Sequence, residues 1–174
     1  MEIILICLAA FFASLLTFFS GFGLGTILMP VFALFFPLEM AIALTGVVHL
    51  LNNLFKMYLV GKEANWRIVI KFGAPAVISA LIGAWLLMSF SETTEWYVYA
   101  LGGKEFVITP IKVMVAFLMF GFAFLELMPF FKKLEFAENK LFIGGVISGF
   151  FGGLSGHQGA LRSAFLIKYG LSKE

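Results

Sequence analysis

The chain has 174 residues, of which 61% are hydrophobic and 13% charged, with 23 phenylalanines and a mean hydropathy of +1.03. Soluble domains are about 45–50% apolar and about 25% charged, so this composition excludes a water-soluble globule. It also excludes a disordered chain, since 17% of the residues are aromatic and the formal net charge is only +2. The basic residues lie at the ends of apolar segments rather than on one face, which argues against nucleic acid and leaves the lipid bilayer as the expected partner.

The first apolar segment covers residues 3–36 and is too long for one straight membrane helix. It would run about 50 Å, against a hydrocarbon core of about 30 Å. A glycine-rich break from Ser20 to Thr26, followed by Pro30, interrupts it, because glycine weakens a helix and proline removes a hydrogen-bond donor. Glu2 stands where a signal peptide carries a basic residue, so we expect a retained membrane segment that bends or breaks near its middle.

Four further apolar segments of spanning length follow, which gives five in all. They cover approximately residues 38–60, 67–90, 108–131 and 141–170. Basic residues outnumber Glu around the loops after the second and fourth segments, so these loops should be cytoplasmic by the positive-inside rule: Lys56, Lys62, Arg67 and Lys71 at the first, and Lys132, Lys133 and Lys140 at the second. The stretch 91–109, with Glu95 and Trp96, is acidic and aromatic; it should face outward and has room for a short extra element. Counting whole spans back from these loops puts the N-terminus inside.

The glycine-rich break occurs twice, with Ser20 and Gly21 matching Ser155 and Gly156 at an offset of 135 residues. Each copy has a long apolar approach, a break, a second apolar stretch and a polar stop. The first copy continues into three more spans, whereas the second copy stops. We therefore expect that the chain is truncated and that the complete protein has about eight spans. The prediction is an all-α, polytopic membrane bundle of two parallel repeats of about four spans: a first repeat at residues 1–134 and an incomplete second repeat at 135–174.

A polar stripe lies in the second segment, where the spacing of His49, Asn52 or Asn53, and Lys56 puts these residues on one face of a helix. That face should point to the bundle interior, and His49, near the middle of the membrane, is the candidate for proton coupling. The alternative is that these polar side chains only hydrogen bond between helices. Lys56 is expected to snorkel to the cytoplasmic interface. Glu126, in the fourth segment, is interpreted as a solvated or paired carboxylate rather than a proton site.

Matched breaks in a membrane protein indicate a transport site, because unwound backbone survives in lipid only inside protein or beside a wet cavity. The amides that begin a half-helix favour an anion, and Arg162 adds a permanent cation with five donors. The alternative is that Arg162, His157 and Gln158 satisfy the backbone groups that the break frees. The candidate substrate-binding residues are Ser20, Gly21, Gly23, Gly25, Asn52, Asn53, Ser155, Gly156, His157, Gln158 and Arg162.

The remaining motifs indicate packing rather than chemistry. Gly145, Gly149 and Gly153 share one helical face, and this spacing of small residues favours close contact between two helices. The chain has no Asp, its two His lie in different segments, and Cys7 is its single cysteine, so neither a catalytic constellation nor a metal motif is present in the sequence. We therefore expect no enzyme, no cofactor and no metal.

The two breaks resemble the motifs of a known family. The sequences SGFGLGTILMP, from Ser20 to Pro30, and GFFGGLSGHQGALR, from Gly149 to Arg162, are similar to those of the sulfite exporter TauE/SafE family of bacterial and archaeal membrane transporters. The resemblance follows the whole chain in order and spacing. It implies two four-helix repeats in the cytoplasmic membrane that move sulfite, sulfonates or related organic anions. Two departures are the end of the chain after the fifth segment and Phe165 in the place of Pro30.

These observations together predict a multi-pass secondary transporter that exports or takes up a small anion such as sulfite, an organosulfonate or a related carboxylate. The alternative is an integral membrane interaction or assembly protein, whose glycine faces pack helices together and which transports nothing itself. The sequence leaves open whether the protein forms a homodimer.

Overall fold

A computed structural model of the chain describes residues 2–20, 23–91, 94–128, 136, 138–157 and 159–166. Its α-helices are α1 (Glu2–Ser20), α2 (Leu24–Ala33), α3 (Leu38–Val60), α4 (Trp66–Ser91), α5 (Pro110–Leu127), α6 (Leu141–Ser155) and α7 (Gly159–Leu166). Between them lie two short 3-10 helices, η1 (Gly61–Glu63) and η3 (Glu138–Lys140), and an antiparallel hairpin of β1 (Tyr97–Leu101) and β2 (Lys104–Ile108). The prediction of an all-α protein with one short extra element after residue 91 is confirmed.

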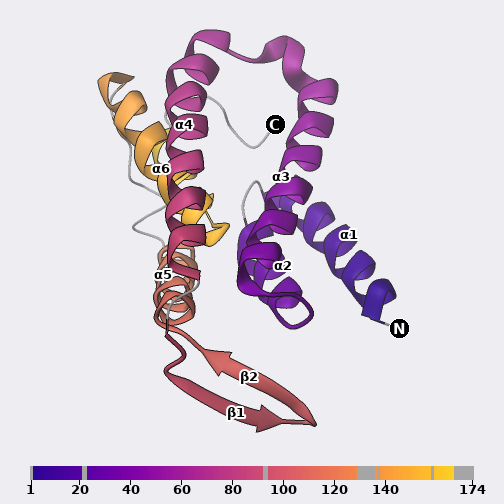
Figure 1. The fold of residues 1–174 in the computed structure, drawn as a ribbon. Coiled ribbons are helices and arrows are strands. Elements are labelled where there is room, and N and C mark those ends of the chain that lie inside the picture. The colour runs from indigo at the N-terminus through magenta and orange to yellow at the C-terminus, as the bar shows by residue number, and fades with distance from the viewer. Residues whose placement is uncertain are drawn as a thin grey trace.

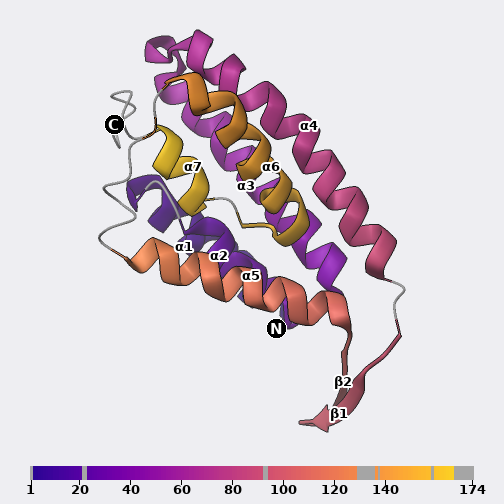
Figure 2. The ribbon, with the colours of Figure 1, turned by 90° about the vertical axis from the view of Figure 1, so that its left-hand side faces the viewer.

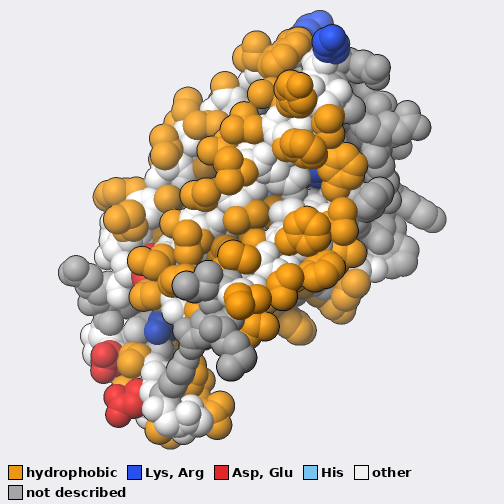
Figure 3. All heavy atoms as spheres, turned by 90° about the vertical axis from the view of Figure 1, so that its right-hand side faces the viewer, with side chains coloured by type: hydrophobic (Ala, Val, Ile, Leu, Met, Phe, Trp, Pro, Cys, Tyr) orange, Lys and Arg blue, Asp and Glu red, His pale blue; other side chains and the backbone are white. Residues whose placement is uncertain are grey.

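Three of the described helices, α3, α4 and α5, are long and apolar enough to cross a membrane. Their bounds follow the predicted segments 38–60, 67–90 and 108–131 closely. Large apolar side chains such as Trp85 and Phe117 stand 66% and 74% exposed, as lipid-facing residues do. Figure 3 shows hydrophobic side chains across the middle of one face, with basic side chains at one end and Glu, beside a further basic side chain, at the opposite end. The chain is therefore a multi-pass membrane protein.

The first predicted segment is not a span but a hairpin of two antiparallel helices, α1 and α2. One apolar cluster joins Ala13 of α1, Leu24 and Phe32 of α2, and Ala41 of α3. Figures 1 and 2 show α2 turning back beside α1, so that the N-terminal end of α1 lies toward the β-hairpin end of the molecule. Gly23, with φ +98°, adopts the left-handed conformation at the turn. Because the segment enters and leaves at one end, the count that placed the N-terminus at the cytoplasmic end is wrong.

Helices α6 and α7 form a second hairpin, which enters from the opposite end. Helix α6 runs in the same direction as α4, since Gly145 lies against Phe72 and Gly153 lies against Ala80. Helix α7 folds back, so that the ring of Phe165 near its end covers Gly144 near the start of α6. Figure 2 shows α7 beside the first half of α6. The break between them contains Gly156, also left-handed at φ +71°.

The glycines of α6 bring this helix into backbone contact with α4. A Cβ at Gly149 would collide with the carbonyl oxygen of Ala76, and one at Gly153 would collide with the carbonyl oxygen of Ala80. Gly83 of α4 faces the carbonyl oxygen of Phe150 in the same way. The predicted packing role of the glycine face is confirmed, and its partner is a helix of the same chain.

The two hairpins share their helix boundaries but point in opposite directions. Ser20 and Ser155 end the first helix of each hairpin, and Leu24 and Gly159 begin the second, so the offset of 135 holds on both sides of the break. Helices α3, α4 and α5 lie between the copies, and this odd number of crossings inverts the second copy. The expected parallel relation of the repeats is therefore wrong, and an inverted one replaces it. The division into residues 1–134 and 135–174 stays a prediction.

Candidate functional site

The tips of the two helix hairpins meet inside the molecule. A Cβ at Gly25, in the first turn of α2, would lie 2.5 Å from the carbonyl oxygen of Gly156 and 3.4 Å from the Cα of His157. Both glycines are buried. The absence of a side chain at Gly25 lets two backbones approach this closely. We call this contact the crossing and define it by Gly25, Gly156 and His157.

Two helices begin at the crossing. Helix α2 starts at Leu24, and α7 starts at Gly159, shortly after Gly156. Gly23 precedes α2 and supplies no side-chain hydrogen bond to its first turn. The first amides of a helix have no partner inside that helix and carry the positive end of its dipole. The backbone at the crossing is therefore suited to an anion.

A buried cluster of three polar side chains lies at the crossing, and we call it the tip cluster: Thr26 from α2, Glu126 from the last turn of α5, and His157 from the second break. The Thr26 hydroxyl donates to Glu126 Oε2 at 2.9 Å, and its oxygen lies 3.1 Å from His157 Nδ1. His157 Nε2 is 3.3 Å from Glu126 Oε1, and the two side chains are 1% and 7% exposed. The cluster thus joins α5 to both hairpins.

Aromatic stacking fixes the orientation of the imidazole in the tip cluster. The rings of Phe122 and His157 lie nearly parallel, with centroids 5.5 Å apart. Phe122 is one turn before Glu126 on α5, so the same helix supplies both the ring that stacks on His157 and the carboxylate that faces it. The ring also packs edge-on against Phe151 of α6. The position of His157 therefore depends on how α5 packs against the second hairpin.

Some of the predicted residues of the breaks lie at the crossing, and others lie elsewhere. Gly25, Gly156 and His157 form the crossing itself, whereas Gly23 stands at the turn before α2 with open space at its Cβ position. The Ser155 hydroxyl donates to the carbonyl oxygen of Phe151 at 2.8 Å, so it satisfies the end of α6. Ser20 is the last residue of α1. Gly21 and Gln158 lie outside the described residues.

The polar stripe of α3 reaches the same region only in part. His49 and Asn52 are half-buried, whereas Asn53 is exposed. His49 is within electrostatic reach of His157 and of Arg162, which is half-buried on α7 and has an interaction of its own. His49 Nε2 is buried and makes no hydrogen bond within the described part of the chain. The structure therefore gathers His49, His157 and Arg162 from three different elements.

Lys56 does not have the role predicted from the sequence. Its Nζ donates to the carbonyl oxygen of Thr17 at 3.0 Å and lies 5.7 Å from the centroid of the Phe18 ring. Thr17 is in the last turn of α1, where unpaired carbonyls and the negative end of the helix dipole attract a cation. Lys56 thus binds the end of α1 beside the first break, instead of snorkelling to the cytoplasmic interface.

The list of candidate residues from the sequence omitted Glu126 and Thr26. The interpretation of Glu126 as a paired carboxylate is confirmed, because Thr26 binds it and His157 faces it. A signal was present, since a single carboxylate in an otherwise apolar segment is costly to insert and is usually functional. The nearby Lys132 and Lys133 obscured it by suggesting a position at the membrane edge.

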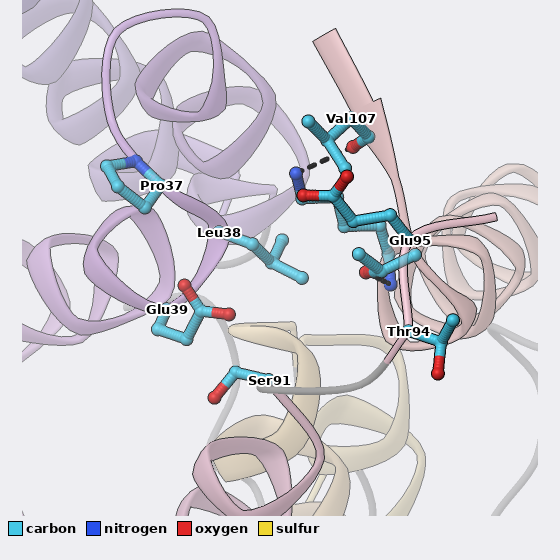
Figure 4. Close-up of a pocket in the computed structure, with 9 residues that line it drawn as sticks. Pro37, Leu38, Glu39, Ser91, Thr94, Glu95 and Val107 are labelled. Atoms are coloured by element: carbon cyan, nitrogen blue, oxygen red, sulfur yellow. Dashed lines mark hydrogen bonds between the residues drawn. The ribbon is translucent and has the colours of Figure 1, made fainter. Parts of the chain in front are cut away.

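A cavity of about 520 Å³ lies away from the crossing, at the β-hairpin end (Figure 4). Glu39 at the start of α3 and Glu95 before β1 line it, together with Lys112. Lys112 Nζ already donates to the carbonyl oxygen of Val107 at 2.7 Å. An anion in this cavity would meet two carboxylates and only one ammonium, so the cavity is less suited to an anion than the crossing is.

The chain matches a known protein family. The family model described as Sulfite exporter TauE/SafE matches residues 6–174. No curated protein and no solved structure matches the chain significantly. The matched range includes both hairpins and the three spanning helices between them.

Proposed function

The chain belongs to the sulfite exporter TauE/SafE family, a family of membrane transporters of sulfite or related anions, and we propose that it is a secondary transporter with the crossing as its substrate site. The proposed cargo is sulfite, an organosulfonate or a related small carboxylate. The proposed location is the cytoplasmic membrane of a bacterium or archaeon. The protein would bind and move its cargo without changing it chemically, so we propose no enzymatic step.

The observation that carries this proposal is the contact between Gly25 and Gly156. It joins two broken helices that enter from opposite ends of the molecule, so each hairpin covers the crossing from one end. Movement of one hairpin would open the site toward that end while the other keeps it closed. Inverted repeats around a central site recur in transporters that work by alternating access.

An anion at the crossing would be held mainly by backbone and by one cation. The first turns of α2 and α7 supply amide donors, and Arg162 lies one turn into α7. A guanidinium offers a planar pair of donors that matches two oxygens of a sulfite or sulfonate group. His157 and His49 can add further donors from the break and from α3.

The alternative function, a membrane assembly protein, predicts glycine faces that are open to another chain. The glycine face of α6 is instead covered by α4 of the same chain at Gly145, Gly149 and Gly153. The strongest packing motif in the sequence is therefore used within the molecule, which favours the transporter.

Flux into proteoliposomes tests the proposal directly. Vesicles containing the purified protein should take up radiolabelled sulfite faster than protein-free vesicles, and excess unlabelled sulfite should compete with this uptake. Competition by sulfoacetate, taurine and acetate, each in turn, would define the class of cargo. Uptake that is no faster than in protein-free vesicles for any of these anions would refute the proposal.

A further inference from the structure

The tip cluster has one hydrogen-bond donor too few for its acceptors when His157 is neutral and Glu126 is ionised. Thr26 has a single hydroxyl proton and donates it to Glu126 Oε2. The contact between Thr26 Oγ1 and His157 Nδ1 therefore needs the proton on Nδ1, because the oxygen can only accept there. A neutral imidazole with its proton on Nδ1 has a lone pair at Nε2. This lone pair faces the lone pairs of Glu126 Oε1 at 3.3 Å.

Within the part of the chain that the structure describes, Glu126 Oε1 and His157 Nε2 are buried and make no hydrogen bond. Two acceptors that face each other without a proton are unfavourable in a buried site. A proton on either atom supplies the missing donor: it gives an acid O–H that donates to nitrogen, or an imidazolium N–H that donates to the carboxylate.

We infer that the tip cluster of Thr26, Glu126 and His157 is the proton-coupling site of the transporter, binding one exchangeable proton between Glu126 Oε1 and His157 Nε2. The inference rests on the proposed anion transport and names its coupling ion. It assigns the proton to Glu126 and His157 rather than to His49, and so departs from the sequence-based interpretation that Glu126 is not a proton site. Thr26 acts as a positioning residue that fixes which atoms face each other.

The same geometry explains how a proton and an anion would be coupled. The Glu126 carboxylate lies at the first turn of α2, the position that the helix dipole makes favourable for an anion. A substrate anion that enters the crossing meets this negative charge, and like charges repel strongly where water is scarce. A bound proton makes the Glu126–His157 pair one unit more positive. Anion binding and proton binding therefore favour each other, by the same factor in each direction.

The surrounding titratable groups support the conclusion that proton binding and anion binding favour each other. His157, Lys56 on α3 and Arg162 on α7 all lie within electrostatic reach of His49. Lys112 is at the opposite end of α5. The neighbours are thus basic groups that keep the region attractive to an anion, and Glu126 is the group whose charge opposes it. Lower pH should accordingly strengthen anion binding.

Proteoliposomes with a trapped pH indicator measure sulfite flux and proton movement together, for the wild type, Glu126→Gln and the control Glu105→Gln on the exposed β-hairpin. Sulfite itself titrates near neutral pH, but this background is the same for all three proteins. Glu126→Gln should lose the protein-dependent proton movement by about tenfold or more while still passing sulfite down its gradient. Glu105→Gln should match the wild type. A proton-to-sulfite ratio in Glu126→Gln equal to that of the wild type would overturn the proton site and leave anion transport standing.

Infrared difference spectroscopy of the purified protein provides a test that does not depend on flux. A pH titration should show one buried carboxyl or imidazole signal that responds to added sulfite, and Thr26→Val should shift it. Absence of such a signal would overturn the proton site. A signal that appears without any sulfite flux would support the proton site while the proposed transport fails.

Discussion

Gly25 of α2 and Gly156 of the second break hold the two helix hairpins in backbone contact at their tips. This contact converts two weak features of the sequence, each a run of glycines in an apolar segment, into one buried site. It also places the tip cluster between α2, α5 and the second break. Transport through the proposed site therefore depends on this contact.

Gly25→Ala should destabilise the protein, because the added methyl group would lie against the carbonyl oxygen of Gly156, which is backbone and cannot rotate away. We expect a loss of about 2 kcal/mol in the free energy of unfolding, typical of overpacking in a tight core. Gly46→Ala in α3 is the matched control, since nothing lies within 4 Å of its Cβ position. Thermal unfolding in detergent measures both variants. Equal stability of the two would show that the tips do not touch.

Much of the fold could be predicted from the sequence because lipid constrains membrane segments directly. The bounds of α3, α4 and α5 follow hydropathy, and Ser20 and Ser155 were correctly placed at the breaks. Whether a break bends a helix or reverses its direction depends on contacts between residues far apart in sequence, such as the ring of Phe165 against Gly144. The sequence around the break does not reveal such contacts. For the same reason the direction of the repeat was predicted incorrectly, and Glu126, whose partners Thr26 and His157 are far away in sequence, was omitted.

Gly149→Ala should separate α6 from α4, because the Ala76 carbonyl oxygen and the Ser79 hydroxyl occupy the space of the new methyl group. The expected cost is again about 2 kcal/mol of stability. Gly73→Ala, on α4 with open space at its Cβ position, should be neutral or slightly stabilising, since alanine favours a helix. Size-exclusion profiles after stepwise heating would compare them. A Gly149→Ala protein as heat-resistant as Gly73→Ala would contradict the packing.

The ends of the molecule should lie on opposite sides of the membrane. In a Cys7→Ser background, Glu95→Cys before β1 should react with an impermeant maleimide in intact cells, and Lys62→Cys in η1 should react only after lysis. A cleavable tag joined ahead of residue 1 should be cut from outside, because α1 begins at the β-hairpin end. Labelling of Lys62→Cys in intact cells would invert the topology. Protection of the tag from external protease would instead show that the first segment crosses the membrane.

His49→Gln separates the two candidate proton carriers. The substitution keeps a hydrogen-bonding side chain but removes titration. If the tip cluster carries the coupling proton, the variant should transport sulfite with the pH dependence of the wild type, measured as initial flux across a series of pH values. Loss of that pH dependence would instead favour His49, the residue predicted from the sequence.

The most direct test of the central claim, that a small anion passes through the crossing, is radiolabelled sulfite flux per folded molecule for the wild type, Arg162→Lys and Arg162→Ala. Lysine keeps the charge but not the forked pair of donors, so Arg162→Lys should be impaired and Arg162→Ala more so, by at least about tenfold. Lys140→Ala, an exposed cation in η3, controls for the loss of one charge. Folded protein is quantified by size-exclusion chromatography alongside the flux. The account predicts folded but slow Arg162→Ala molecules, and flux equal to that of the wild type would contradict it.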